Sequence, residues 1–336
     1  MAEAPILVTG ATGLLGNNVV RLLLERGRRV RVLVRGGSDP QPLAGLDLEV
    51  VHGDVRDAGT VRTAAAGVSA IIHAAAWVRL TRRQLDVARE INVHGTCHVA
   101  NEARESGVRL IHVSTIDALA PGSPSQPANE DTPGQKLLCS YVLSKREAEC
   151  EVLRRVGEGL DAVIVNPGYL LGPWDWKPSS GRMLLEVAQR FAPFAPRGGT
   201  SICDVRDVAA GTLAAIDRGQ PGRRYILAGE NMTYLEAWRR FAALGGRRGP
   251  IKRYSRPVGW LTGILGDARE RWASGESVIN SATIGLGNTF HYYSSERARA
   301  ELGYRTRPAD ESIRDAWEWF ITHGYVRGAA AKARGG

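Results

Sequence analysis

The chain has 336 residues, of which 43% are hydrophobic and 24% are charged, and these proportions exclude a disordered or fibrous protein. Lysines and arginines outnumber aspartates and glutamates by 44 to 35, but they are spread along the chain without interleaved aromatics, so we expect no nucleic-acid partner. No apolar run approaches the length of a membrane span, and the 4 cysteines form no CxxC pair or histidine cluster; we expect a cytoplasmic protein with no membrane partner and no metal site.

The first half of the chain alternates short apolar runs with longer segments of helical periodicity. The runs are Ile6–Thr9, Val30–Val34, Leu48–Val51, Ala70–Ala75, Leu110–Ser114 and Asp161–Asn166. The helical segments between them include Gly13–Glu25, Leu85–Glu105 and Ser140–Val156. Runs without polar alternation are typical of strands buried on both faces, and helices between strands indicate a parallel sheet. The pattern predicts an α/β fold with a Rossmann-type, doubly wound parallel sheet over residues 1–166.

Beyond Asn166 the periodicity is less regular. One strand-like run and three helical segments are mixed with glycine and proline turns: Arg224–Leu227, Leu235–Leu244, Ser294–Leu302 and Ser312–His323. We predict a smaller C-terminal α/β cap that binds the substrate, formed by residues 167–199 and 219–326. We expect residues 200–218 to return to the Rossmann domain and residues 327–336 to form a disordered tail.

A glycine-rich turn, TGATGLLG, joins the first strand to the first helix. Gly10 allows a tight turn, Gly13 lets the backbone approach a pyrophosphate, and Gly16 lets the helix pack closely on the strand. The helix N-terminus offers free N–H groups to phosphates. Placed between a strand and a helix, this motif predicts a dinucleotide site, the alternative being a structural glycine turn. Its predicted residues are Gly10, Thr12, Gly13, Leu14, Leu15 and Gly16.

The end of the second strand indicates which dinucleotide binds. NAD-binding proteins commonly place a carboxylate there, whereas an arginine accommodates the 2′-phosphate of NADP. The strand is followed by Arg35, and no carboxylate occurs before Asp39. Arg35 therefore favours NADP(H), with NAD(H) possible, unless it is an exposed arginine without a role. Residues after the third and fourth strands are also expected beside the cofactor: Asp54, Val55, Ala74, Ala75 and Ala76.

Tyr141 and Lys145 lie four residues apart on a predicted helix and share one face. The lysine charge, with that of oxidised nicotinamide, would lower the tyrosine pKa from about 10 toward working pH. Such a tyrosine can donate a proton to a carbonyl oxygen as hydride arrives; the alternative is an exposed Tyr/Lys pair. Ser114 and Thr115 end the fifth strand, where either hydroxyl could stabilise the substrate oxygen.

Together these motifs resemble the extended short-chain dehydrogenase/reductases of the NAD-dependent epimerase/dehydratase superfamily, from about residue 5 to 325. The shared segments, in the family's order, are TGATGLLG, GDVRD, HAAA, INVHGT, HVSTIDAL, YVLSK and NPGYLLGP. STIDALAPGS and HYYSSERARAELGYRTRP are most similar to the dihydroflavonol-reductase-like and 3β-hydroxysteroid-dehydrogenase-like branch. Asn166 stands where many sugar-modifying members have arginine.

The resemblance implies a role for each matching residue. Thr115 would be the catalytic hydroxyl with Ser114 beside it, and Tyr141 the acid/base. Lys145 would be its electrostatic partner and bind the nicotinamide ribose, and Asn92 would support the proton relay. The segment expected to line the nicotinamide is Pro167, Gly168, Tyr169 and Leu170. The resemblance also implies a homodimer formed through helices near 85–105 and 140–156.

Several aromatic residues follow or neighbour this segment. Trp174 and Trp176, with Tyr169 and Trp77, suggest an apolar wall of the substrate pocket, although they could equally pack the core of the cap. Arg182 leaves a polar substrate possible. We therefore predict an NADP(H)-dependent oxidoreductase that interconverts a ketone and a secondary alcohol on a moderately hydrophobic small molecule. The alternatives are a nucleotide-sugar epimerase or dehydratase and a non-catalytic NADP(H)-sensing protein.

Overall fold

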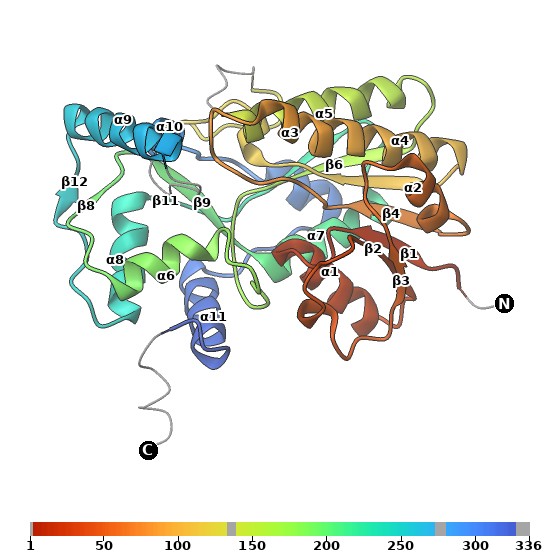
Figure 1. Cartoon of the computed structure of the whole chain (residues 1–336), viewed down its shortest axis with the longest axis horizontal. Coiled ribbons are helices and arrows are strands. Elements are labelled where there is room, and N and C mark those ends of the chain that lie inside the picture. Colours follow the sequence, from red (N-terminus) through yellow and green to blue (C-terminus); the bar gives the residue numbers. More distant parts are fainter. Residues whose placement is uncertain (1–2, 133–138, 273–279, 327–336) are drawn as a thin grey trace.

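The computed structural model describes residues 3–132, 139–272 and 280–326. Its largest element is a seven-stranded sheet with the order β10-β6-β5-β4-β1-β2-β3, in which every pairing is parallel (Figure 1). The strands are β1 (Ile6–Thr9), β2 (Val30–Val34), β3 (Glu49–His52), β4 (Ala70–His73), β5 (Arg109–Val113), β6 (Ala162–Pro167) and β10 (Arg224–Leu227). This sheet confirms the predicted Rossmann-type α/β fold.

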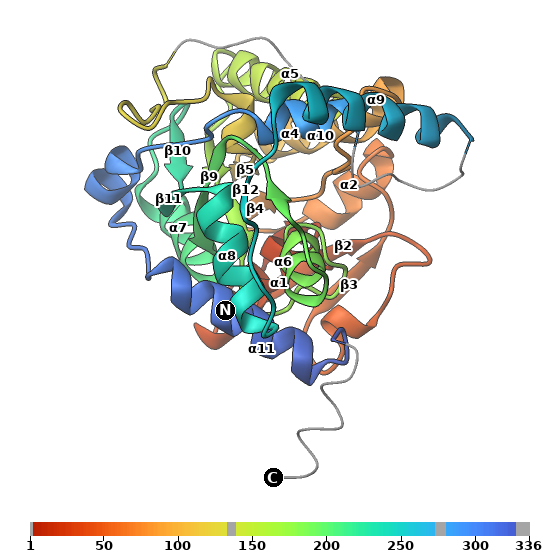
Figure 2. The same ribbon diagram turned by 90° about the vertical axis from the view of Figure 1, so that its left-hand side faces the viewer.

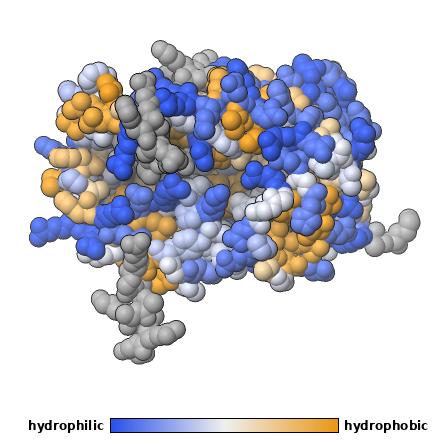
Figure 3. Space-filling model, viewed as in Figure 1, coloured by the Kyte–Doolittle hydropathy of each residue, from blue (hydrophilic) through white to orange (hydrophobic). Residues whose placement is uncertain are grey.

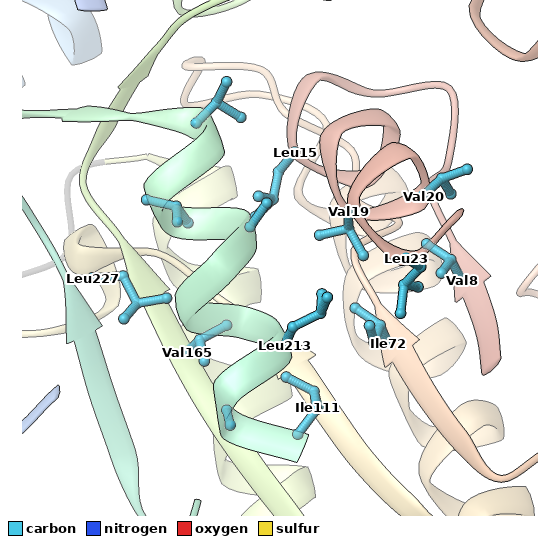
Figure 4. Close-up of a cluster of buried hydrophobic side chains, with 14 of the residues drawn as sticks. Val8, Leu15, Val19, Val20, Leu23, Ile72, Ile111, Val165, Leu213 and Leu227 are labelled. Carbon is cyan, nitrogen blue, oxygen red and sulfur yellow. The ribbon is translucent and has the colours of Figure 1, made fainter. Parts of the chain in front are cut away.

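Helices cover both faces of this sheet, which is why most of its strand residues are apolar. On one face, Val8 and Ile72 pack with Val19 of α1 and Leu213 of α7 (Figure 4). Their strand neighbours point to the other face, where they meet residues of α2, α4 and α5. The helices are α1 (Leu14–Glu25), α2 (Ala58–Ala65), α3 (Leu85–Arg89), α4 (Gly95–Glu105), α5 (Ser140–Val156) and α7 (Val205–Arg218).

The predicted helix over 85–105 contains a π-helical turn, η2 (Glu90–His94), between α3 and α4. Such turns shift the side chains that follow them around the helix and are frequent at functional sites. Asn92 lies in this turn and is buried. The other short helices are η1 (Gln41–Leu43), η3 (Ile116–Ala118) and the π-helical η4 (Ala298–Leu302).

A smaller sheet, of order β11-β9-β7, lies beside the large one (Figures 1 and 2). Its strands are β7 (Tyr169–Leu171), β9 (Gly199–Asp204) and β11 (Glu230–Thr233). Leu184, Phe241 and Phe320 from three helices form an apolar cluster with this sheet. These helices are α6 (Gly181–Gln189), α8 (Tyr234–Leu244) and α11 (Ala309–Thr322). The remaining elements are β8 (Phe194–Ala195), β12 (Lys252–Arg253), α9 (Arg256–Trp272) and α10 (Ser281–Gly287).

Two predicted domain boundaries differ from the structure. β10 falls within 219–326, predicted as cap, yet it pairs with β6 and completes the large sheet. β9 falls within 200–218, predicted to return to the Rossmann domain, yet it pairs with β7 and β11 in the small sheet. α7, which follows β9, packs against the large sheet, and Cys203 of β9 joins the same apolar cluster. Local periodicity indicates a buried strand but not its partner, because pairing is a tertiary contact. The predicted tail, 327–336, lies outside the described residues.

Candidate active site

The turn between β1 and α1 is too tightly packed for side chains. Gly10 has a φ of +74°, and a Cβ there would lie 2.6 Å from the carbonyl carbon of Ala74. A Cβ on Gly16 would lie 2.2 Å from the carbonyl oxygen of Gly10. Gly13 is exposed at the start of α1, next to the half-buried Thr12. The turn therefore leaves backbone N–H groups open at a helix N-terminus, an arrangement that fits a pyrophosphate.

The neighbouring strand ends bring Arg35 and Asp54 to the same edge of the sheet. Arg35 follows β2 and is exposed. Asp54 follows β3 and accepts hydrogen bonds from the backbone and guanidinium of Arg56. The Arg56 side chain, then its backbone and the charge of Arg35, hold the pKa of Asp54 below its usual value. Asp54 is thus bound by its own neighbour, while Arg35 remains open to an anionic group.

Beyond β4 and β6, the predicted cofactor residues also lie at this edge. The backbone N–H of Ala74 donates to the Thr9 carbonyl at 3.1 Å, so the chain after β4 runs past the glycine turn. The N–H of Ala75 donates to the Thr9 hydroxyl at 3.3 Å. Gly168 lies between β6 and β7, and a Cβ on it would lie 2.7 Å from the Ser201 carbonyl oxygen, so a side chain would not fit there.

The hydroxyls of Thr115 and Tyr141 meet at the carboxyl end of β5. Thr115 is the N-cap of η3, and its Oγ1 accepts a hydrogen bond from the Asp117 N–H at 3.2 Å. Its hydroxyl also hydrogen-bonds the phenol of Tyr141, in the first turn of α5. Next to it, the Ser114 hydroxyl is buried and has no hydrogen-bond partner among the described residues. Such a buried hydroxyl is available to a substrate oxygen.

Lys145 lies one helical turn after Tyr141 and is buried. Its ammonium donates to the Val113 carbonyl oxygen at 2.7 Å and lies 3.4 Å from His112 Nε2. Burial lowers its pKa to about 8, against the opposing charge of Glu149. The lysine charge is therefore fixed beside the end of β5.

The protein groups around Tyr141 raise the pKa of its phenol. Burial raises the pKa of Tyr141 well above its usual value, and the Asp117 carboxylate adds to this effect. The hydrogen bond from Thr115 opposes it. Among the protein groups alone, burial and the Asp117 charge outweigh the Thr115 hydrogen bond, so these groups do not lower the pKa. The lowering expected with oxidised nicotinamide present stays a prediction.

Asn92, in the π-helical turn, connects the loop after β4 to α5. Its Oδ1 accepts from the Trp77 N–H at 2.7 Å, and its Nδ2 donates to the Trp77 carbonyl at 3.0 Å. The same Nδ2 donates to Ser144 Oγ at 2.9 Å, and Ser144 Oγ donates to the Tyr141 carbonyl at 3.0 Å. Asn92 thus touches the backbone segment that carries Tyr141 and Lys145, which is a positioning contact.

A buried polar network behind these residues was missed by sequence reasoning. Asn166 Nδ2 donates to the Thr115 carbonyl at 2.9 Å and to Glu149 Oε1 at 2.6 Å. The other oxygen of Glu149 pairs with Arg224 Nε at 2.7 Å. Glu149 lies four residues after Lys145, on the same helix face. That spacing was the available signal, and it places a carboxylate next to the lysine.

A second missed pair is Asp117 and His291. Asp117 Oδ1 lies 2.8 Å from His291 Nδ1, and His291 Nε2 lies 3.1 Å from the Leu286 carbonyl. A carboxylate and a carbonyl only accept hydrogen bonds, so these two neighbours favour the protonated form of the ring. Burial alone would lower the pKa of His291, but Asp117 and these hydrogen bonds raise it overall. Both residues lie in segments that carried the family resemblance, STIDAL and HYYSS.

The predicted aromatic wall is largely engaged in packing. Trp176 meets Trp319 edge-on at 5.1 Å, and Trp319 stacks on His323 at 4.2 Å. The Arg21 guanidinium carbon lies 3.3 Å from the centre of the Trp174 ring. Trp174 and Trp176 therefore pack on the small-sheet cluster, and Trp174 connects it to α1. Their contact with substrate stays a prediction.

The other predicted pocket residues have separate surroundings. The Tyr169 hydroxyl donates to the Ser180 carbonyl. Trp77 is half-buried, and the Arg79 guanidinium carbon lies 5.9 Å from its ring centre. Arg182 is exposed on α6. Among the described residues, no three histidine, cysteine, aspartate or glutamate side chains are grouped to hold a metal ion.

Comparisons with known proteins match nearly the whole chain. The model of the NAD dependent epimerase/dehydratase family matches residues 6–228. Sterol demethylase protein B of Methylococcus capsulatus is 36% identical over 333 residues, covering 95% of this chain and 99% of that protein. A Synechocystis sp. protein provisionally named dihydroflavonol 4-reductase is 34% identical over 331 residues, covering 95% of each chain. The crystal structure of gox2253 has a TM-score of 0.85 at 36% identity, covering 97% of this chain and 100% of that one.

Proposed function

Because the chain belongs to the NAD dependent epimerase/dehydratase family, we propose that it is an NADP(H)-dependent reductase or dehydrogenase of a ketone or secondary alcohol. Family membership makes it an NAD(P)-dependent oxidoreductase of the extended short-chain type. The observation that carries the finer proposal is the meeting of Thr115, Tyr141 and Lys145 at the carboxyl end of β5.

A bound nicotinamide supplies or accepts the hydride. In the reductive direction, the phenol of Tyr141 donates its proton to the substrate oxygen. The Thr115 hydroxyl, which already hydrogen-bonds this phenol, stabilises the same oxygen as it gains charge. The buried, unpaired hydroxyl of Ser114 supports a second contact there. Lys145, with a pKa of about 8, stays largely protonated at neutral pH and favours the tyrosinate that remains.

The residues at the sheet edge would hold the cofactor. The glycine turn and the N-terminus of α1 would hold the pyrophosphate, and Lys145 the nicotinamide ribose. The preference for NADP(H) is supported by Arg35, exposed beyond β2, with Asp54 already bound by Arg56. Between the end of β2 and Asp39 the sequence contains no carboxylate that could bind the ribose 2′-hydroxyl.

A moderately hydrophobic substrate is supported by two observations. Asn166 stands where many sugar-modifying members have arginine, and its side chain is buried in the contacts with Thr115 and Glu149. It therefore offers no charge to a nucleotide sugar. The relatives named for sterol and dihydroflavonol chemistry favour the same substrate class.

The test is a fluorescence titration of the purified protein with NADPH and NADH in parallel, followed by a panel of ketones with the preferred cofactor. We expect tighter binding of NADPH, and its oxidation by an apolar cyclic or long-chain ketone. Tighter binding of NADH would contradict the role of Arg35. A co-purifying cofactor that is never consumed would favour an epimerase, and binding without any turnover would favour a sensing protein.

A further inference from the structure

Five apolar side chains on α9 face solvent. Between 42% and 67% of the surface of each is exposed, and we call this set the α9 apolar face: Val258, Trp260, Leu261, Ile264 and Leu265. The helix lies at the edge of the molecule in both ribbon views, and apolar side chains gather at this place on the surface (Figures 1, 2 and 3). Exposed apolar patches of this kind mark interaction sites.

The inner side of α9 is made of glycines. Gly259, Gly263 and Gly266 are buried. A Cβ on Gly259 would lie 2.6 Å from the Tyr254 ring, and a Cβ on Gly263 would lie 3.1 Å from the Ser281 Cα of α10. Amphipathic helices normally turn their large apolar residues toward the core. Because α9 does the reverse, its apolar face is left exposed by the part of the chain that the structure describes.

The chain around the start of α9 is strongly basic. From residue 247 to 266 it carries 5 basic residues and no acidic residue. Lys252, Arg253 and Arg256 lie directly before or at the start of the helix, and all three are exposed. An apolar helix face with an exposed tryptophan and adjacent cations complements one kind of surface, that of an anionic lipid bilayer.

We propose that α9 docks on an anionic membrane surface, with its apolar face at the acyl boundary and Lys252, Arg253 and Arg256 among the lipid headgroups. A second copy of the chain fits less well, since a two-fold contact through this face would bring the same basic segments together. None of the described helices is long and apolar enough to cross a bilayer. The expectation of no membrane partner considered only spanning segments, and a helix lying in the surface needs no such length.

The docking surface adjoins the candidate active site. α9 packs on α10, whose Ala282 and Leu286 form a small cluster with Cys139, Val142 and Tyr141. Docking would therefore place the bilayer on the side of the molecule where α10 meets the catalytic helix. The proposal does not depend on which reaction the site performs.

The experiment is vesicle co-sedimentation of the full chain at low and high salt. We expect binding to phosphatidylcholine vesicles that contain phosphatidylglycerol, weaker binding to phosphatidylcholine alone, and loss of binding as salt increases. Changing Lys252, Arg253 and Arg256 to glutamine should lower the partition coefficient about fivefold per residue at low salt. The double variant Trp260→Ser/Leu265→Ser should lower it at least about tenfold.

The control is Val50→Ser, since Val50 is 48% exposed but lies on β3, the far edge strand of the large sheet. It should bind vesicles like the wild type, and all variants should keep the wild-type melting temperature because the changed side chains are exposed. Equal binding by the double variant and Val50→Ser, or no binding of the wild type to anionic vesicles, would overturn the proposal. A third outcome would also overturn the proposal: the wild type is a dimer by light scattering, the double variant is a monomer, and neither binds vesicles.

Discussion

Acid should destabilise the protein through His73, a fully buried residue at the end of β4. Its Nδ1 lies 2.7 Å from the Thr9 hydroxyl, and its Nε2 lies 3.1 Å from the Thr96 hydroxyl. Burial, with a smaller effect of the Lys145 charge, lowers its pKa to about 3. In an unfolded chain the pKa of histidine is about 6.5. The unfolded state therefore binds the proton first, and stability is lost as pH falls below about 6.5.

The magnitude follows from these two pKa values. Between about pH 7 and about pH 5 the folded protein leaves His73 neutral while the unfolded chain protonates it, which costs about 2 kcal/mol of unfolding free energy. Urea unfolding of the wild type and His73→Phe at both pH values measures this effect. The phenylalanine keeps a buried ring that does not titrate.

The comparison of the wild type with His73→Phe isolates the contribution of His73 protonation to the pH dependence of stability. His73→Phe removes one hydrogen-bond partner from each of two buried threonine hydroxyls, so it should be less stable at both pH values by about 1–3 kcal/mol. Its loss of stability between the two pH values should nevertheless be about 2 kcal/mol smaller than that of the wild type, because contributions of other groups cancel. An equal loss in both proteins would refute the reasoning.

Three further predictions concern the cofactor turn and the buried network. Gly16→Ala should lower stability by about 1–3 kcal/mol, because its Cβ would lie 2.2 Å from a backbone oxygen. It should also weaken NADPH binding in titration. The control Gly36→Ala, with open space around it, should change neither stability nor NADPH binding. Glu149→Gln removes a charge that raises the pKa of Lys145, so the alkaline limb of the pH–rate profile of NADPH oxidation should move to lower pH. An unchanged pH–rate profile would contradict the coupling between Glu149 and Lys145. Arg35→Ala should weaken NADPH binding about tenfold or more and leave NADH binding unchanged, whereas equal losses would argue against a 2′-phosphate contact.

Much of the fold follows from local patterns in the sequence. The bounds predicted for β1, β2, α5 and β10 agree with the structure, because apolar runs and helical spacing end at clear turn residues. The family resemblance, including the dihydroflavonol-reductase-like branch, is confirmed by the comparisons. The meeting of Thr115 with Tyr141 also follows from placing one at a strand end and the other at the next helix start.

What could not be predicted depends on contacts between distant segments. Asp117 and His291 are 2.8 Å apart in space although most of the cap lies between them in the chain. Glu149 and Asn166 come from a helix and a strand. The spacing of Glu149 from Lys145 places it on the helix face of the lysine, but no local pattern pairs it with Asn166. The outward apolar face of α9 has the same composition as a core helix, so only the structure shows that its glycines, and not its large residues, face inward.

The most direct test of the proposed chemistry is turnover by Tyr141→Phe, measured as NADPH oxidation with a ketone that the wild type reduces. If Tyr141 is the acid/base, this change removes the proton donor alone: turnover falls by about 100-fold or more, while NADPH affinity in a parallel titration stays at the wild-type value. Turnover near the wild-type rate would contradict the assignment of Tyr141 as the acid/base, and with it the proposed mechanism.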